Sequence, residues 1–216
     1  KNLCLAGGVA LNCVANGKLL REGGQEHLWI QPASGDAGGA LGAALAAYHL
    51  HLEQPRQLPP SGDSMKGSYL GPIFSDEEIA KRLEGMSAQF EVLEEDEFIR
   101  SCVEILQEGK AVGWFQGRME FGPRALGARS ILGDARSPQM QSVLNLKVKF
   151  RESFRPFAPS VLREDVSKWF DMDSDSPYML LVADIIKECQ LPMTGEQKQL
   201  FGIEKLNVPR SKIPAI

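Results

Sequence analysis

The chain has 216 residues, of which 43% are hydrophobic and 24% are charged, with a net charge of −4; this is typical of a folded globular protein that can bury a core. No apolar run reaches the ~18 residues that a membrane span needs, and the acidic pI of about 5.5 argues against nucleic-acid binding. No two of the 4 cysteines form a C-x-x-C pair, which argues against both a disulfide framework and a zinc site. Such cysteine usage indicates a reducing, cytoplasmic compartment.

The first part of the chain predicts two successive strand–turn–helix units, and this alternation is typical of the α/β class. Two strands and two helices cannot bury a core alone, so we expect residues 1–52 to belong to a larger domain inside which the chain begins. The expected elements are a strand over 3–6, a helix over 9–20, a strand over 28–31 and an Ala/Leu-rich helix to about residue 52.

The rest of the chain predicts a linker and a second α/β domain. Residues 53–66 (EQPRQLPPSGDSMK) are rich in Pro, Ser and charge and form the expected linker, and residues 67–216 the second domain. Ser75 followed by Glu78 predicts a capping box at the start of a helix. The other expected elements are a helix over 96–109, a strand over 111–115, a helix over 137–146 and a strand over 178–183, with little periodicity after residue 187.

Two glycine-containing turns, LAGGVALN and SGDAGGALGAA, each join a strand to a helix. Glycines there let the backbone approach a phosphate near a helix N-terminus, but they also serve close packing, and neither turn is a GxGxxG or Walker motif. Asp36 in the second turn is interpreted either as a helix N-cap or as a metal ligand. His27, His49 and His51 are expected at the surface rather than as ligands.

Residues 113–163 carry nine cations against three acids, within a segment rich in Gly and Pro. Such loops wrap a ligand, and the planar fork of arginine grips phosphate or carboxylate. One or two of the arginines, Arg136 or Arg163, are instead expected to pair with the acids of residues 91–97. Glu120 is expected to orient an arginine rather than to act as a base.

The segments LAGGVALNCVANGKL, QPASGDAGGALGAAL, GWFQGRMEFGPRALGARSILGDAR and KFRESFRPFAPSVL resemble the O-carbamoyltransferases of the nodulation and antibiotic-tailoring type. The resemblance covers almost the whole chain. It implies an α/β fold in which residues 1–52 are part of an actin/sugar-kinase-like ATPase domain. Residues 67–216 would then be a YrdC-like domain with a twisted sheet.

The resemblance also implies a reaction and its residues. Carbamoyl phosphate and ATP would give carbamoyl-adenylate, and the carbamoyl group would pass to a hydroxyl of a small acceptor. The implied nucleotide contacts are Gly7, Gly8, Asn12, Gly35, Gly38 and Gly39. Asp36 is the implied ligand of a metal, iron or alternatively magnesium. The expected phosphate cradle is Arg118, Arg124, Lys149, Arg151 and Arg155, of which Arg124 and Arg155, each beside a proline, are expected to converge on one pocket.

Two other classes remain open: an actin-like sugar kinase, and a non-catalytic nucleotide-binding or regulatory module. No H-x-x-x-H pair accompanies Asp36, and we expect the chain to be a fragment that does not perform the overall transfer alone. O-carbamoylation by the purified 216-residue chain would contradict that expectation. Neither a nucleic acid nor a membrane is an expected partner. The acceptor is not predicted, and homodimerisation is left open.

Overall fold

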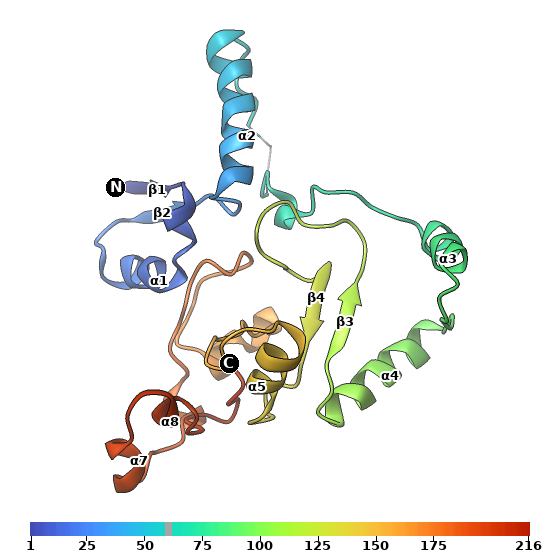
Figure 1. The fold of residues 1–216 in the computed structure, drawn as a ribbon. Helices are drawn as coiled ribbons and strands as arrows, with labels where there is room; N and C mark the ends of the chain where they lie inside the picture. Colours follow the sequence, from blue (N-terminus) through green and yellow to red (C-terminus); the bar gives the residue numbers. More distant parts are fainter. Residues whose placement is uncertain (59–61) are drawn as a thin grey trace. The chain divides into compact units, whose positions relative to one another are not determined.

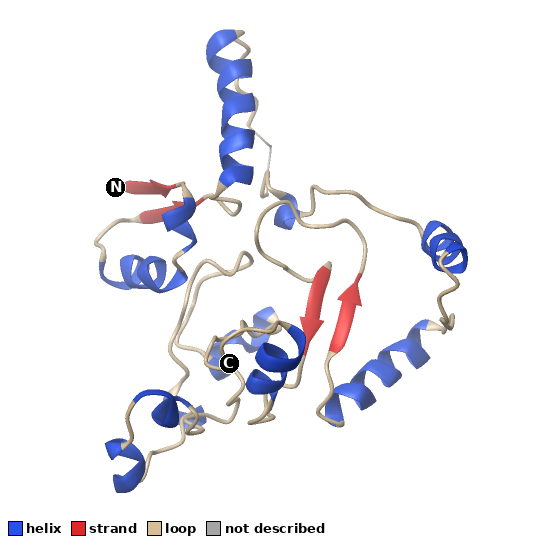
Figure 2. Ribbon diagram, viewed as in Figure 1, coloured by secondary structure: helices blue, strands red, loops and turns tan. Residues whose placement is uncertain are grey.

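The computed structural model describes residues 1–58 and 62–216 and contains small β-sheets, helices and long loops (Figures 1 and 2). The predicted α/β class is confirmed. Of the predicted linker, residues 59–61 lie outside the described residues. The chain forms two compact units: unit 1 is Lys1–Phe90, Trp114–Ser130 and Ser176–Val182, and unit 2 is Glu91–Gly113, Ile131–Asp175 and Ala183–Ile216. The division at residues 53–66 stays a prediction.

Unit 1 opens with the two predicted strand–turn–helix units. Strands β1 (Asn2–Leu5) and β2 (His27–Ile30) pair in parallel, with Asn2 opposite His27. Because the carboxyl ends of parallel strands meet at one edge of a sheet, both glycine turns lie at the same edge. The elements that follow the strands are the 3-10 helix η1 (Gly8–Leu11), α1 (Cys13–Glu22), α2 (Asp36–Ala46) and the π-helix η2 (Ala47–His51).

The predicted strand at 178–183 is wrong, because its backbone carbonyls bond to side chains of α1 rather than to a neighbouring strand. Asn16, 2% exposed, donates from Nδ2 to the Leu180 carbonyl at 3.1 Å. Arg21 donates to the Val182 carbonyl at 2.8 Å. Residues 178–183 therefore form a loop that begins with a turn, and its part in unit 1 lies along α1.

The predicted capping box is confirmed at the start of α3 (Asp76–Gly85): the Glu78 N–H donates to Ser75 Oγ and the Ser75 N–H to Glu78 Oε2. The helix expected over 96–109 is α4 (Glu95–Gln107), and the strand expected over 111–115 is β3 (Val112–Phe115). Strand β3 pairs with β4 (Arg129–Leu132), which runs in the opposite direction (Figure 1). The sequence analysis missed β4.

Unit 2 has a small core of Met140, Leu144 and Ala215, against which Phe157 packs. The helix expected over 137–146 appears as α5 (Met140–Val143) and continues as the π-helix η4 (Leu144–Val148). The later elements are η5 (Arg163–Asp165), α6 (Val166–Trp169), η6 (Lys187–Cys189), α7 (Gly195–Gln199) and α8 (Gly202–Leu206). Among the described residues, no helix combines the length and apolar character required to cross a membrane.

Candidate active site

The glycines of the two turns in unit 1 fall into two kinds. A Cβ added at Gly7, Gly8, Gly35 or Gly39 would meet nothing within 4 Å, so the backbone there faces open space. Gly7 also has a φ of +90°, which L-residues rarely adopt. Gly38 differs, since its Cβ would lie 2.4 Å from the Ala33 carbonyl oxygen. The open glycines leave room for a ligand, whereas Gly38 serves close packing.

Asn12 and Asp36 occupy different positions at their helices. The Asn12 side chain accepts from the Ala15 N–H at 3.1 Å and is the N-cap of α1. The N-cap interpretation of Asp36 is wrong, because Gly35 is the N-cap of α2 and Asp36 is the first residue of the helix. An exposed carboxylate in a first turn interacts favourably with the helix dipole.

The described residues do not assemble a complete metal site around Asp36. No group of three or more His, Cys, Asp or Glu side chains that could hold a metal occurs within residues 1–58 and 62–216. His27 and His51 are exposed as predicted, and His49 Nδ1 bonds to the Gln54 carbonyl. One carboxylate cannot hold iron alone, so the metal stays a prediction and no chemical step is derived through it.

The loop that carries Arg124 lies against both glycine turns of unit 1. Arg124 Nη2 donates to the Leu11 carbonyl at 3.1 Å, at the end of the first turn. A Cβ on Gly122 would lie 3.0 Å from the Cβ of Ala33, which directly precedes the second turn. Arg124 Nε is buried and has no hydrogen-bond partner among the described residues. Arg118 donates to the Gly71 carbonyl at 2.7 Å.

Glu120 is a buried residue of the segment over 113–136, which is called the arginine stretch. Its Oε1 accepts from the Leu126 N–H at 2.6 Å and the Ala128 N–H at 2.8 Å, and its Oε2 from Arg129 Nε at 2.9 Å. Burial alone would raise the pKa of Glu120, but these hydrogen bonds outweigh it and lower the pKa from 4.5 to about 2. A carboxylate held in this way is a poor base, so the prediction that Glu120 orients an arginine is confirmed.

Two arginines are paired with other acids than predicted. Arg136 bonds to Asp134, with Nη2 and Oδ2 2.8 Å apart, and this pairing lowers the pKa of Asp134. Arg163 bonds to Asp175. The expected pairing of Arg136 or Arg163 with residues 91–97 is therefore wrong, because each arginine meets an acid nearer in sequence.

Three predicted cations lie on one loop of unit 2, immediately after η4. Arg151 lies over the Phe157 ring, with its Cζ 5.0 Å from the ring centre. Arg155 Nε lies 3.0 Å from Glu152 Oε2, and both side chains are about half exposed. Lys149 is exposed, and neither Lys149 nor Arg151 forms an ion pair within the described part of the chain. Arg118 and Arg124 belong to unit 1, so the convergence of Arg124 and Arg155 stays a prediction.

Family models match both ends of the chain. The carbamoyltransferase N-terminus model matches residues 1–45. The carbamoyltransferase C-terminus model matches residues 103–216, which is more than half of the chain.

The chain belongs to the carbamoyltransferase family. It is 61% identical to an uncharacterized protein of Synechocystis, over 100% of this chain and 35% of that protein. It is 40% identical to nodulation protein NolO of Bradyrhizobium diazoefficiens, over 99% of this chain and 39% of NolO. It is 33% identical to 3'-hydroxymethylcephem-O-carbamoyltransferase of Streptomyces clavuligerus, over 86% of this chain and 33% of that enzyme. The chain thus spans about a third of the length of these relatives.

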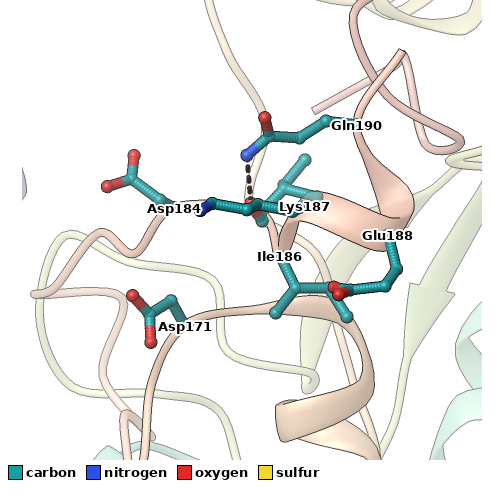
Figure 3. Close-up of a pocket in the computed structure, with 7 residues that line it drawn as sticks. Asp171, Asp184, Ile186, Lys187, Glu188 and Gln190 are labelled. Carbon is teal, nitrogen blue, oxygen red and sulfur yellow. Dashed lines mark hydrogen bonds between the residues drawn. The ribbon is translucent and has the colours of Figure 1, made fainter.

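A cavity of about 420 Å³ in unit 2 contains none of the predicted site residues (Figure 3). Three carboxylates and one ammonium line it, so its charge disfavours a phosphate ligand. The Gln190 amide donates to the Ile185 carbonyl at 2.6 Å, a bond drawn as the dashed line in Figure 3. Its lining residues are Asp171, Asp184, Ile185, Ile186, Lys187, Glu188 and Gln190.

One polar residue beside the loop over residues 149–155, called the cation loop below, was not predicted from the sequence. Asn145 is 0% exposed and lies in η4, within the apolar segment SVLNLKV. An amide in an apolar segment needs partners when it is buried. An asparagine inside an apolar segment is therefore the sequence signal that could have identified Asn145.

Proposed function

We propose that the whole protein, of which these residues form a part, transfers a carbamoyl group from carbamoyl phosphate to a hydroxyl of a small acceptor, with ATP as the activating nucleotide. The family membership supports the transferase class. The relative from Streptomyces clavuligerus is named as an O-carbamoyltransferase, which supports a hydroxyl acceptor. The observation that carries the proposal is the loop of unit 2 on which Lys149, Arg151 and Arg155 lie together.

The proposed reaction balances as three displacements. Water attacks the phosphorus of carbamoyl phosphate, the bond from phosphorus to the carbamoyl oxygen breaks, and phosphate and carbamate result. A carbamate oxygen attacks the α-phosphorus of ATP, pyrophosphate leaves, and carbamoyl-adenylate forms. The acceptor hydroxyl oxygen then attacks the carbamoyl carbon, its proton passes to solvent, and AMP leaves. Each transition state spreads negative charge over oxygens, which fixed cationic donors stabilise.

The geometry within each unit supports the proposed residue roles. In unit 1, the open backbone at Gly7, Gly8, Gly35 and Gly39 is proposed to approach the nucleotide, beside Arg124. In unit 2, the cation loop is proposed to hold the phosphoryl group of carbamoyl phosphate. Asp36 is proposed as one ligand of the metal, and the other ligands are proposed to lie outside the described residues. The finer fold, an ATPase-like segment over 1–52 and a YrdC-like domain over 67–216, is part of the proposal.

Titration calorimetry on the chain with carbamoyl phosphate tests the phosphoryl site. Arg155→Ala is expected to weaken the affinity at least about tenfold, since one hydrogen bond to a charged group is worth about 1.5–3 kcal/mol. Arg136→Ala is the matched control: it removes the same charge from the same unit, but its guanidinium is bonded to Asp134. Equal affinities in the two variants would contradict the assigned loop. Binding of ATP alone, unaffected by Arg124→Ala, would instead support a nucleotide-binding module.

A further inference from the structure

The loop over residues 149–155 is folded around the side chain of Asn145. Asn145 Nδ2 donates to the Ser153 carbonyl at 3.0 Å and to the Arg155 carbonyl at 2.8 Å. Asn145 Oδ1 accepts from Arg151 Nε at 2.6 Å. The amide thus uses two donors and one acceptor on the loop that carries the three cations.

These contacts fix what kind of residue can occupy position 145. Only the stated orientation of the amide matches donors with carbonyls and the acceptor with the Arg151 N–H. The side chain is 0% exposed, so an apolar replacement would leave these loop groups without their partner. An aspartate would keep the acceptor but place a carboxylate oxygen against two carbonyl oxygens.

The backbone of the loop is held in a conformation that its own residues do not favour. Phe150 has a φ of +47°, although it is neither glycine nor asparagine, and its side chain is 84% exposed. Since no packing of Phe150 stabilises this conformation, its neighbours must hold it. The Arg151 N–H donates to the Asn145 carbonyl at 2.9 Å, and the Lys149 N–H to the Leu144 carbonyl at 2.9 Å.

These contacts fix the guanidinium of Arg151 and leave its two Nη groups available to a ligand. Its Nε is held by Asn145 and its Cζ lies over the Phe157 ring. Its two Nη groups have no hydrogen-bond partner among the described residues. A guanidinium that is bonded at Nε and in cation–π contact with a ring loses little freedom when its Nη groups bind an oxyanion.

We infer that Asn145 is a positioning residue of the anion site in unit 2: it acts through the loop over 149–155 and directs Lys149, Arg151 and Arg155 to one phosphoryl group. This inference rests on the proposed function, since it names the residue that organises the same site. It adds a role that neither the charge pattern nor the motif of the loop assigns.

Asn145→Leu tests the role by separating anion affinity from stability. Calorimetry with carbamoyl phosphate and with inorganic phosphate is expected to show at least about a tenfold loss of affinity at a temperature where circular dichroism shows the variant folded. Met140→Ala is the matched control, since Met140 is 1% exposed in the same core and bonds to no residue of the loop by its side chain. It is expected to lower the unfolding midpoint while leaving the affinity of the folded chain within about twofold.

A second variant keeps the test decisive if Asn145→Leu does not fold. Gln141 Nε2 also donates to the Arg155 carbonyl, at 3.2 Å, and its side chain is only partly buried. Gln141→Leu is expected to fold and to weaken phosphate binding about two- to fivefold, because Asn145 still holds the loop. Restoring affinity with Asn145→Gln is not expected, since the longer side chain moves the amide out of reach.

The outcomes separate this inference from the proposed function. Wild-type binding of carbamoyl phosphate with equal affinity in Asn145→Leu, or in Asn145→Gln where the first variant is unfolded, overturns the inference and leaves the proposed function standing. Absence of wild-type binding to both carbamoyl phosphate and phosphate overturns both. A loss of affinity in the loop-supporting variants but not in Met140→Ala supports both.

Discussion

Replacing Glu120 by glutamine is expected to lower the free energy of unfolding by about 3 kcal/mol at pH 7. The Glu120 side chain is 0% exposed, and its pKa is lowered from 4.5 to about 2, a difference of some 2.5 units at about 1.4 kcal/mol each. Glutamine keeps one acceptor, but its NH₂ group must face either the Arg129 donor or the backbone N–H groups. Urea unfolding followed by fluorescence measures the change.

The same interaction gives a pH dependence of known sign. A carboxyl with a lowered pKa in the folded state stabilises the protein above its ordinary pKa, and the contribution is lost as the pH falls through the lowered value. The wild type should therefore lose this stability between about pH 4.5 and pH 2. Glu120→Gln has no proton to bind there, so the difference between the two proteins should shrink across this range.

Glu108→Gln is the control for the Glu120 experiment. Glu108 pairs with Lys110 at 2.6 Å, but both side chains are more than half exposed, and exposed pairs contribute little. Its effect should stay within about 0.5 kcal/mol at every pH. A Glu120→Gln change as small as that of Glu108→Gln, or one that grows toward acid pH, would contradict the assigned role of the buried carboxylate.

The parts of the fold that depend on local sequence could be predicted. Ser75 and Glu78 bond to one another across one helical turn, so the capping box needs no distant partner. The short apolar strands β1 and β2 and their following helices were also predicted, since each strand–turn–helix segment is contiguous in the chain. In these segments the hydrophobic period and the turn residues agree with the folded state.

The parts that depend on distant partners could not be predicted. Residues 178–183 have the composition of a strand, but the partner of Leu180 is Asn16, 164 positions away. Strand β4 was missed because it lies inside the glycine-rich arginine stretch, where its pairing with β3 decides its conformation. In both cases tertiary contacts, rather than the intrinsic β-propensity of the residues, decide the conformation.

In the candidate site, too, features set by local sequence could be predicted and features set by distant contacts could not. The charge pattern located the cation loop, and the isolated acid Glu120 was correctly assigned to orienting an arginine. The bond from Arg124 to Leu11 joins residues 113 positions apart and was not predicted from the residue pattern. The composition of a turn also could not separate glycines that leave space for a ligand from glycines that pack, because this depends on what lies opposite each Cα.

Replacing Gly38 or its neighbour Gly39 by alanine is expected to change the free energy of unfolding in opposite directions. A Cβ at Gly38 would lie 2.4 Å from the Ala33 carbonyl oxygen, and Ala33 is 0% exposed, so the backbone would have to move. Gly38→Ala should lower the free energy of unfolding by about 1–3 kcal/mol. A Cβ at Gly39 meets nothing within 4 Å, so Gly39→Ala should raise it by up to about 1 kcal/mol through helix propensity.

Urea unfolding of the two variants against the wild type decides the packing role, and titration calorimetry with ATP decides the ligand role. If the open side of the second turn approaches a nucleotide, the methyl group of Gly39→Ala should weaken ATP binding in a protein that is more stable than the wild type. A loss of affinity that accompanies a gain in stability cannot arise from damage to the fold, since damage would lower both. Gly39→Ala with unchanged ATP affinity would remove Gly39 from the proposed nucleotide contacts, and destabilisation by both alanines would contradict the distinction between the open and the packed glycine.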